Sequence, residues 1–282
     1  MLLIPEYLVV GHVTWDVGAD GALRPGGTAT YSALTAHRLG LKTAVLTSAD
    51  PEYPLFARAP SIALHRLPAQ RTTTFENTYL AQGRRQYIRA LATPLAREDV
   101  PEAWERAVIV HLGPVAREVD VRLVEAFSPS LLGLTLQGWL RRWDGDGLVS
   151  YAAWDGARRG LHVADVVVLS LEDLEGDARR LAPYASETDH LVLTQGREGA
   201  TVYYRGHVVH MPAYKVREVD STGAGDVFAT AYFVRFFETQ DVRESLRFAN
   251  AAASFIVETV GARGMPSREQ IAWRLGHGRL RE

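Results

Sequence analysis

Residues 219–228 contain two glycines around an alanine, followed directly by an aspartate and an apolar segment: Val219-Asp220-Ser221-Thr222-Gly223-Ala224-Gly225-Asp226-Val227-Phe228. The apolar residues that follow predict a helix over 223–237. The first backbone N–H groups of a helix lack intrahelical partners and lie at the positive end of its dipole, so they can bind an anion. Glycines let a phosphate approach such a backbone closely. The segment therefore predicts a phosphate-binding turn.

Asp226 is placed beside this phosphate, where a second negative charge is electrostatically unfavourable. A catalytic role explains the conflict, because a carboxylate there can accept the proton of an attacking hydroxyl while the amides stabilise the phosphoryl charge. The alternative is an ordinary helix that has an aspartate in its first turn, which is common. A Gly-X-Gly pattern alone does not separate the two interpretations.

The longer string, residues 220–228, resembles the C-terminal signature of the ribokinase-like, or PfkB, family of carbohydrate and nucleoside kinases. That signature is Asp-Thr-x-Gly-Ala-Gly-Asp-x-Phe, and Ser221 is the only departure from it. The resemblance implies that Gly223, Ala224 and Gly225 form the anion hole and that Asp226 is the catalytic base. It also implies ATP and Mg²⁺ as cofactors.

A second part of the resemblance lies near the N-terminus. An apolar segment, 7–13, predicts the first strand, and Asp16 follows it; Gly26-Gly27 then precede a predicted helix over 28–39. In the family an aspartate at this place binds substrate hydroxyls, and the glycines let the substrate lie against the helix start. An ordinary loop acid is the alternative for Asp16.

Further matches concern the nucleotide and the metal. The family carries Asn-x-x-Glu after a strand, which organises magnesium through water; here Ser170 and Asp173 match, and Glu172 is an adjacent candidate. A helix cap formed by Ser170 and Asp173 is the alternative. A monovalent cation remains an open alternative at 261–262, where many members build a cation loop. The positions that the resemblance assigns to the nucleotide are Ser170, Thr194, Gly196, Gly199, Thr222 and Asn250.

The departures from the family concern the substrate. Sugar kinases usually have an asparagine four residues after the second glycine, and here that residue is Tyr31. The ring of Tyr31 is expected to face the substrate and to favour one with an apolar or stackable face. An Asp-Pro-Asn-x-Arg-like segment appears as Gln137-Gly138-Trp139-Leu140-Arg141, so Gln137 and Arg141 are the candidate substrate contacts.

The remaining pattern predicts an α/β fold. Short apolar runs alternate with helical stretches, which is typical of a parallel sheet covered on both faces. Helices are also expected over 119–127 and 171–181. The resemblance implies a ribokinase-like three-layer α/β/α sandwich with a small, reduced β lid. We expect a single domain over residues 1–282, with the lid as a hairpin around 72–90 that turns at Gln82-Gly83.

The composition excludes some classes of function. The formal net charge of −2 does not indicate nucleic acid or an anionic membrane as a partner. There are no cysteines, which excludes disulfides and thiolate metal sites and fits an intracellular protein. The first residues do not resemble a signal peptide, and no apolar run approaches the roughly 20 residues that span a bilayer. A cytoplasmic monomer or homodimer is expected.

The expected function is transfer of the γ-phosphoryl group of ATP to a hydroxyl of a small polyol, a sugar or a cyclitol. Two alternatives stay open: a nucleoside kinase of the same fold, and a catalytically silent nucleotide-binding or regulatory protein. A NAD-dependent dehydrogenase is disfavoured, because no Gly-x-Gly-x-x-Gly follows the first strand.

Overall fold

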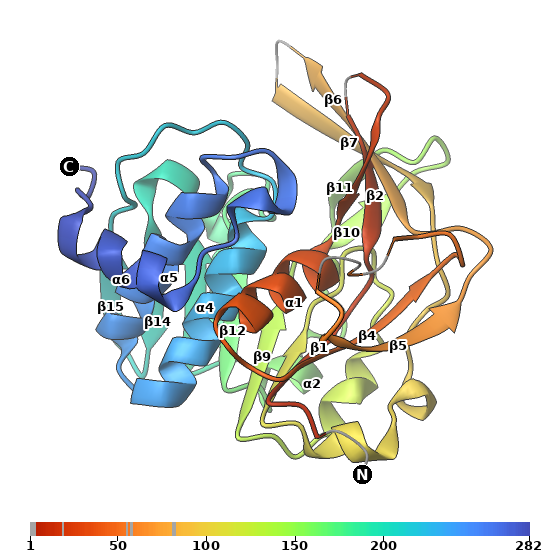
Figure 1. The fold of residues 1–282 in the computed structure, drawn as a ribbon, viewed down its shortest axis with the longest axis horizontal. Helices are drawn as coiled ribbons and strands as arrows, with labels where there is room; N and C mark the ends of the chain where they lie inside the picture. The colour runs from red at the N-terminus through yellow and green to blue at the C-terminus, as the bar shows by residue number, and fades with distance from the viewer. Residues whose placement is uncertain (1–3, 19, 55, 57–58, 81–82) are drawn as a thin grey trace.

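A nine-stranded sheet forms the centre of the computed structural model, which describes residues 4–18, 20–54, 56, 59–80 and 83–282 (Figure 1). All neighbours from β13 to β5 pair in parallel, and β14 and β15 continue the sheet in antiparallel fashion. In spatial order the strands are β15 (His207–Met211), β14 (Ala200–Tyr204), β13 (His190–Thr194), β12 (Val166–Ser170), β9 (Leu131–Thr135), β8 (Ile109–Leu112), β1 (Tyr7–Val10), β4 (Thr43–Ala49) and β5 (Ala63–Pro68).

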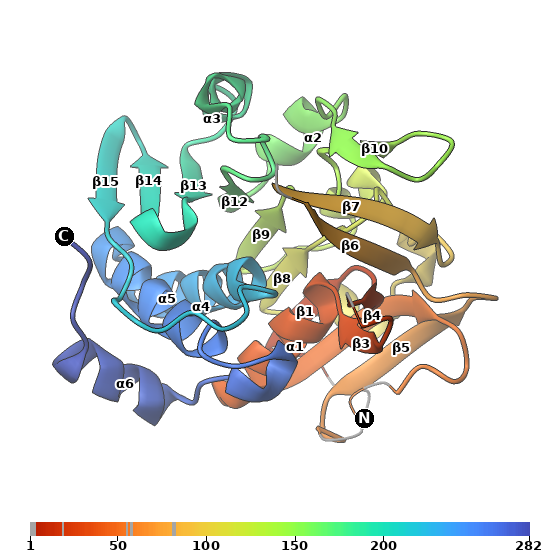
Figure 2. The same ribbon diagram turned by 90° about the horizontal axis from the view of Figure 1, so that it is seen from above.

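Helices cover both faces of this sheet (Figure 2). One face packs against α1 (Thr28–Arg38), α4 (Ala224–Thr239), α5 (Val242–Ile256) and α6 (Arg268–His277). The other face carries α2 (Ala157–Leu161), α3 (Ala182–Ala185) and short 3₁₀ turns. Each face has its own apolar core, because consecutive side chains of a strand point to opposite faces. The predicted three-layer α/β/α sandwich is confirmed.

A separate four-stranded sheet forms the lid. Its order is β3 (Leu23–Gly26), β2 (Thr14–Val17), β6 (Thr74–Leu80) and β7 (Gly83–Ala90). Figure 1 shows this sheet projecting away from the sandwich. The hairpin expected around 72–90 is found as β6 and β7, and its turn residue Gln82 lies outside the described residues. The segment between Asp16 and Gly26 is an additional hairpin of the lid, which the sequence did not indicate.

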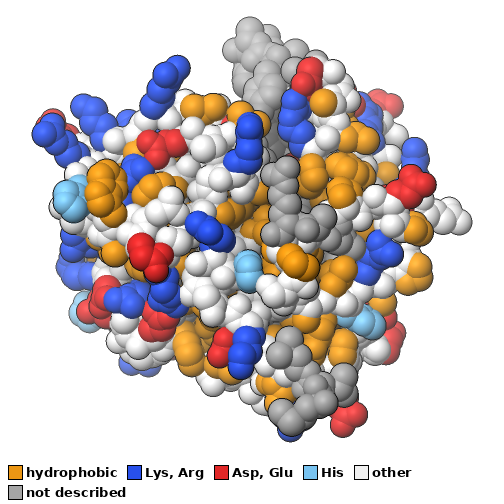
Figure 3. All heavy atoms as spheres, in the orientation of Figure 1, with side chains coloured by type: hydrophobic (Ala, Val, Ile, Leu, Met, Phe, Trp, Pro, Cys, Tyr) orange, Lys and Arg blue, Asp and Glu red, His pale blue; other side chains and the backbone are white. Residues whose placement is uncertain are grey.

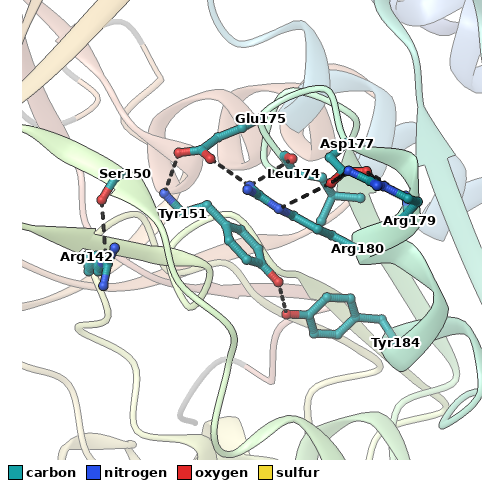
Figure 4. A network of polar contacts seen from close by, with 9 residues as sticks. All are labelled: Arg142, Ser150, Tyr151, Leu174, Glu175, Asp177, Arg179, Arg180 and Tyr184. Atoms are coloured by element: carbon teal, nitrogen blue, oxygen red, sulfur yellow. Dashed lines mark hydrogen bonds and ion pairs between the residues drawn. The ribbon is translucent and has the colours of Figure 1, made fainter.

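A third small sheet connects the lid to the sandwich. It consists of β10 (Arg141–Trp143) and β11 (Val149–Tyr151), and the Ile88 N–H of β7 donates to the Gly147 carbonyl between them (2.8 Å). Figure 4 shows how β11 is held: the Glu175 carboxylate accepts from the Tyr151 N–H (2.8 Å) and pairs with Arg180 (2.6 Å). The β10–β11 hairpin, which carries Arg141, is therefore bonded to β7 through Gly147 and to Glu175 through Tyr151.

Two predicted helices are wrong. Over 119–127 and 171–181 the chain forms only the 3₁₀ helices η3 (Val121–Glu125) and η4 (Ala178–Leu181). In the second segment Glu175 and Gly176 have positive φ angles of 52° and 76°, which end any right-handed helix there. The apolar periodicity that indicated helices serves packing against the sheet instead.

Charges of both signs are mixed on the surface. On the face shown in Figure 3, acidic and basic side chains are interspersed over the helices and the lid. Among the residues described, the search for a helix with the length and hydropathy of a membrane span finds none. The prediction of one domain over residues 1–282 stays a prediction.

The strand order makes the carboxyl edge of the sheet the place where a ligand site is expected. From β1 the chain continues to β4 on one side, whereas β8 leads to β9 and β12 on the other. Open parallel sheets bind ligands beyond the carboxyl ends of their strands, next to such a change of direction. Gly11 and Gly113 follow β1 and β8, and a Cβ on Gly11 would lie 2.2 Å from the Gly113 carbonyl oxygen. The two glycines therefore allow these strand ends to approach closely.

Candidate active site

The turn before α4 has the backbone geometry of an anion site. Gly223 is the N-cap residue, with φ 79° in the left-handed region. The Asp220 carboxylate accepts from the N–H groups of Thr222 (2.9 Å) and Gly261 (3.2 Å), which fixes the turn to the segment after α5. A Cβ on Gly225 would meet no atom within 4 Å, so the first turn of α4 faces open space. An anion can reach its amides there.

Asp226 lies in the first turn of α4 and is half-buried. Burial raises the pKa of its carboxyl to about 7; Asp173 and Asp16 add to the rise, whereas a hydrogen bond from Thr28 and the charge of Arg141 oppose it. A carboxyl with a pKa near neutrality suits proton transfer at physiological pH. Residues from β2, β10, α1 and the segment after β12 therefore lie near enough to Asp226 to affect its pKa.

Asp16, on β2, lies directly above the glycines that precede α1. A Cβ on Gly26 would stand 2.1 Å from the Asp16 Oδ2 atom, and the Thr14 hydroxyl donates to Oδ1 (3.1 Å). Gly27 has φ 86°, and a Cβ there would be 2.6 Å from the His12 carbonyl oxygen. Both glycines are thus required by the close approach of the lid strand to the helix start.

The environment of the Tyr31 side chain differs from the one expected from the sequence. The side chain is 2% exposed, and three of its ring atoms lie within 2.5 Å of where a Cβ on Gly223 would be. The ring therefore packs beneath the phosphate turn, and the expectation of a ring face open to a stacked substrate is wrong. Burial raises the pKa of Tyr31, and the carboxylates of Asp16, Asp220 and Asp226 raise it further. Tyr31 is thus a buried residue that lies close to the charged groups of the site.

Arg141, the first residue of β10, extends toward the site. Its Nη1 atom donates to the Val115 carbonyl (2.8 Å), and its guanidinium lies 5.2 Å from the ring centre of Phe75 on β6. Because its charge also acts on Asp226, Arg141 connects the lid, the sandwich and the candidate base. Gln137 is half-buried just beyond β9, at the same edge of the sheet.

The residues predicted to bind the nucleotide and its magnesium lie at or after the ends of β12 and β13. Ser170 and Thr194 are register neighbours at the carboxyl ends of these strands. The Ser170 N–H donates to the Asp173 carboxylate (2.8 Å), and the Asp173 N–H donates to the Ser170 hydroxyl (3.0 Å). These reciprocal bonds have the pattern of a cap but close a turn, because no helix starts at Ser170. Asp173 also acts electrostatically on Asp226. Glu172 is exposed beside it.

The remaining predicted donor contacts have structural roles of their own. Gly196 and Gly199 have positive φ angles, 56° and 96°, and a Cβ on Gly199 would be 2.1 Å from the Met211 carbonyl oxygen. The side-chain amide of Asn250 donates to that same carbonyl (3.2 Å) and to the Pro212 carbonyl (3.4 Å). Asn250 is 6% exposed, so its amide holds the end of β15.

The acidic groups fit magnesium only as partners of its water ligands. Among the described residues, no group of three or more His, Cys, Asp or Glu side chains is arranged to hold a metal directly. Mg²⁺ keeps several waters and is commonly held by one or two carboxylates together with substrate phosphates. Asp173 fits that outer role, because its charge acts on Asp226 in the first turn of α4.

Two residues of the site were missed by sequence reasoning. Thr28 is 1% exposed, and it opposes the rise in the pKa of Asp226. Glu118 is 4% exposed, and its carboxylate accepts from the N–H groups of His12 (3.0 Å), Val115 (2.9 Å) and Ala116 (2.6 Å). It therefore joins the segments that follow β1 and β8. The position of Thr28 directly after two glycines was the available signal, whereas the sequence around Glu118 carries none.

Comparison with known proteins agrees with this geometry. Residues 148–269 match the profile of the pfkB family of carbohydrate kinases. The chain is 42% identical over 82 residues to the ribokinase of Bacillus subtilis (29% of this chain, 28% of that protein). It is 35% identical over 200 residues to a fructokinase of Escherichia coli (63% and 64%) and 26% identical over 294 residues to a nucleoside kinase of Methanothermobacter thermautotrophicus (91% and 90%). The matched parts thus span less than two thirds of that ribokinase and that fructokinase.

Solved structures give the same fold. A pyrophosphate-dependent kinase of the ribokinase family, complexed with a pyrophosphate analogue and myo-inositol, superposes with a TM-score of 0.79 at 23% identity, covering 95% of this chain and 99% of that one. The Arabidopsis thaliana ribokinase complexed with ribose and ATP gives 0.74 at 18% identity, covering 97% and 99%. The fold is therefore the ribokinase fold. Within this fold, residues 148–269 are similar to the pfkB family of carbohydrate kinases.

Proposed function

We propose that the protein is an ATP-dependent kinase that phosphorylates a hydroxyl of a sugar or a cyclitol. The observation that supports this most directly is the position of Asp226 in the first turn of α4, next to a phosphate-binding turn and opposite Asp16 of the lid. One helix start thus offers backbone amides for a phosphate and a carboxylate for a hydroxyl proton. The proposal includes a cytoplasmic location and a monomeric or homodimeric state.

In the proposed reaction, the acceptor oxygen forms a bond to the γ-phosphorus of ATP while the bond from that phosphorus to the β-phosphate oxygen breaks. The hydroxyl proton passes to the Asp226 carboxylate, and ADP leaves. The amides of Gly223, Ala224 and Gly225 bind the charged oxygens of the transferring group. Magnesium, when bound, supplies further charge stabilisation on the phosphates. Asp16 binds neighbouring hydroxyls and so orients the acceptor.

The first test is a screen of donors and acceptors. Purified protein is incubated with Mg²⁺ and either ATP or pyrophosphate, against sugars, cyclitols and nucleosides, with Asp226→Asn protein as the control. Pyrophosphate is included because a structural relative uses it, and nucleosides because a relative over most of the chain is a nucleoside kinase. Phosphorylation of a polyol by wild type alone is the expected result. No product from any pair would favour the silent nucleotide-binding alternative.

The pH dependence of the proposed reaction follows from Asp226. Its pKa is raised to about 7, and only the deprotonated carboxylate can accept a proton. We therefore expect kcat/KM to rise about tenfold per pH unit below pH 7 and to level off above it. A pH profile with saturating Mg²⁺ measures this, and a flat profile between pH 5 and 8 would contradict the assignment of the base.

A magnesium titration tests the acidic residues after β12. Replacing Asp173 and Glu172 together by alanine should raise several-fold the Mg²⁺ concentration needed for half-maximal rate, because their charge no longer attracts the hydrated ion. Asp177→Ala is the matched control: its carboxylate caps η4 by accepting from the Arg179 N–H (3.1 Å) and pairs with the Arg179 guanidinium (2.8 Å), so it tests the loss of a neighbouring aspartate together with its cap and ion pair. An unchanged magnesium requirement in the double variant would exclude this role.

A further inference from the structure

His12 lies where the chain passes from the sandwich to the lid. It stands two residues after the end of β1 and two residues before β2, the lid strand that carries Asp16. The residue is 0% exposed. Buried polar groups of native proteins are hydrogen-bonded, and an imidazole has two nitrogens to satisfy. The partners of this ring therefore show which parts of the molecule it joins.

The ring of His12 bonds to both ends of the β6–β7 hairpin. Its Nδ1 atom lies 2.7 Å from the Thr73 hydroxyl oxygen, directly before β6, and its Nε2 atom lies 2.9 Å from the Thr93 carbonyl oxygen, beyond β7. A carbonyl only accepts, so Nε2 carries the hydrogen and Nδ1 accepts from the Thr73 hydroxyl. That hydroxyl in turn accepts from the Ala92 N–H (3.0 Å). One neutral ring thus holds the two strand ends together.

The backbone of His12 is fixed on the sandwich side. Its N–H donates to the buried carboxylate of Glu118 (3.0 Å), and the N–H of the next residue, Val13, donates to the Thr47 hydroxyl on β4 (3.0 Å). Its carbonyl oxygen would lie 2.6 Å from a Cβ on Gly27, the N-cap residue of α1. The ring therefore extends from a backbone that the sandwich holds, and it can determine where the hairpin lies.

Thr73 connects this ring to the strand of Asp16. Its hydroxyl bonds to His12, and its carbonyl accepts from the Trp15 N–H of β2 (2.9 Å). From there β2 pairs in parallel with β6. The Asp16 carboxylate lies close to the start of α1, where a Cβ on Gly26 would be 2.1 Å from its Oδ2 atom. A displacement of Thr73 would therefore move β2 and change the distance of Asp16 from α1.

We infer that His12 is a positioning residue for the acceptor site: its ring fixes the base of the lid and thereby holds Asp16 above the start of α1. The side chain is completely buried, so it acts through Thr73 and β2 and not by contact with the acceptor. This inference rests on the proposed function, because that function assigns Asp16 to the acceptor hydroxyls. It predicts a larger effect on acceptor binding than on ATP binding.

Three variants test the two ring bonds. His12→Leu removes both of them. His12→Asn keeps an oxygen that can accept from Thr73 but is too short to reach Thr93. His190→Leu is the matched control, because His190 is also buried (2% exposed) and its Nε2 atom bonds the Tyr232 hydroxyl (2.8 Å), but it lies at the amino end of β13, at the opposite edge of the sheet. Thermal unfolding of each variant sets a temperature at which all are folded.

In His12→Leu protein we expect the KM of the best acceptor from the screen to rise about fivefold to hundredfold, the effect of one or two lost hydrogen bonds. The KM of ATP and kcat should stay within about threefold, because Asp226 and the glycine turn belong to α4. His12→Asn should lie between His12→Leu and wild type, and His190→Leu should lower thermal stability without a selective change in acceptor KM. An unchanged acceptor KM in His12→Leu, or an equal rise in both KM values, would overturn the inference.

A double-mutant cycle with Thr73→Val tests the proposed route. Thr73→Val removes the hydroxyl that bonds Nδ1, so it should raise the acceptor KM as well. If His12 acts through Thr73, the two substitutions together should raise that KM by clearly less than the product of their separate effects. Independent effects that multiply would contradict the route through Thr73.

Amide hydrogen exchange gives a readout that does not depend on turnover. We expect amides of β2 and β6 to exchange about fivefold faster or more in His12→Leu than in wild type, with those of β12 and β13 unchanged. In His190→Leu protein, β2 and β6 should exchange as in wild type. If wild type phosphorylates no acceptor, the proposed function fails while this measurement still decides whether His12 holds the lid. Unchanged exchange of β2 and β6 in His12→Leu would show that it does not.

Discussion

Asp226→Asn protein is expected to fold, to bind ATP and to lose about 10²–10⁴-fold of its phosphoryl transfer, the usual contribution of a general base. The amide keeps the size of the side chain but cannot accept the hydroxyl proton at neutral pH. The measurement is kcat with the best acceptor from the screen, together with ATP affinity by calorimetry. Turnover close to wild type would remove Asp226 from the mechanism.

Stability separates loss of chemistry from loss of structure in this variant. The pKa of Asp226 is raised in the folded protein from 3.8 to about 7, so the folded state binds the proton more tightly than the unfolded chain. The carboxyl therefore lowers folding stability as pH rises from about 4 to about 7, and this loss remains at higher pH. The neutral amide avoids that loss. We expect Asp226→Asn to unfold at a higher temperature than wild type at pH 8, with a smaller difference at pH 4.

A matched control is Asp241→Asn, at the start of α5. Asp241 caps that helix by accepting from the Glu244 N–H (2.9 Å), and it is exposed. The substitution also neutralises an aspartate at a helix N-terminus, but away from the site. It should leave kcat unchanged and lower stability by at most about 1 kcal/mol. A similar loss of turnover in both variants would point to a general effect of charge.

Gly223→Ala is expected to lower the free energy of unfolding by about 2–4 kcal/mol and to abolish most activity. The backbone at this residue has φ 79°, which disfavours any side chain, and the new methyl group would stand 2.3 Å from a ring atom of Tyr31. Either the ring or the phosphate turn must move. Chemical denaturation measures the stability, and kcat with the donor KM measures the damage to the turn.

Gly225→Ala separates steric strain from blocked phosphate binding. A Cβ at Gly225 meets no atom within 4 Å, so stability should change by less than about 1 kcal/mol. The methyl group would nevertheless occupy the open space in front of α4, where the phosphate is proposed to bind. We expect a raised donor KM in a stable protein. Full activity of Gly225→Ala would place the phosphate elsewhere, and normal stability of Gly223→Ala would contradict the packing of Tyr31.

Much of the fold could be predicted because its signals are local. The predicted first strand over 7–13 is found as the shorter β1 (Tyr7–Val10), and the other buried strands β4, β8, β9, β12 and β13 are short apolar runs as well. The predictions failed where the same spacing of apolar residues fits more than one kind of secondary structure. The segments that contain η3 and η4 have apolar residues at helical spacing, but positive φ angles at Glu175 and Gly176 interrupt the second one. Nothing in the spacing reveals such a turn.

The lid shows the same limit for strand pairing. The hairpin of β6 and β7 alternates polar and apolar residues, and this alternation predicted it. The β2–β3 hairpin, in which Asp16 pairs with Arg24, has no such pattern. Its residues lie against Gly26 and the start of α1 and not against an apolar core. Its existence depends on contacts between distant parts of the chain.

By itself, the sequence determined the glycine turn before α4 and the aspartate that follows it. A close backbone approach and a left-handed residue at a helix start require glycine locally, so Gly223, Gly225 and Asp226 can be recognised from one short string. Only the tertiary structure decided how that turn is supported. The face of α1 that meets α4 and the burial of Tyr31 beneath Gly223 both depend on how two helices nearly 200 residues apart in the sequence pack on one sheet. Such contacts are set by long-range packing, because a side chain's partner across a core is chosen by the register and spacing of whole elements.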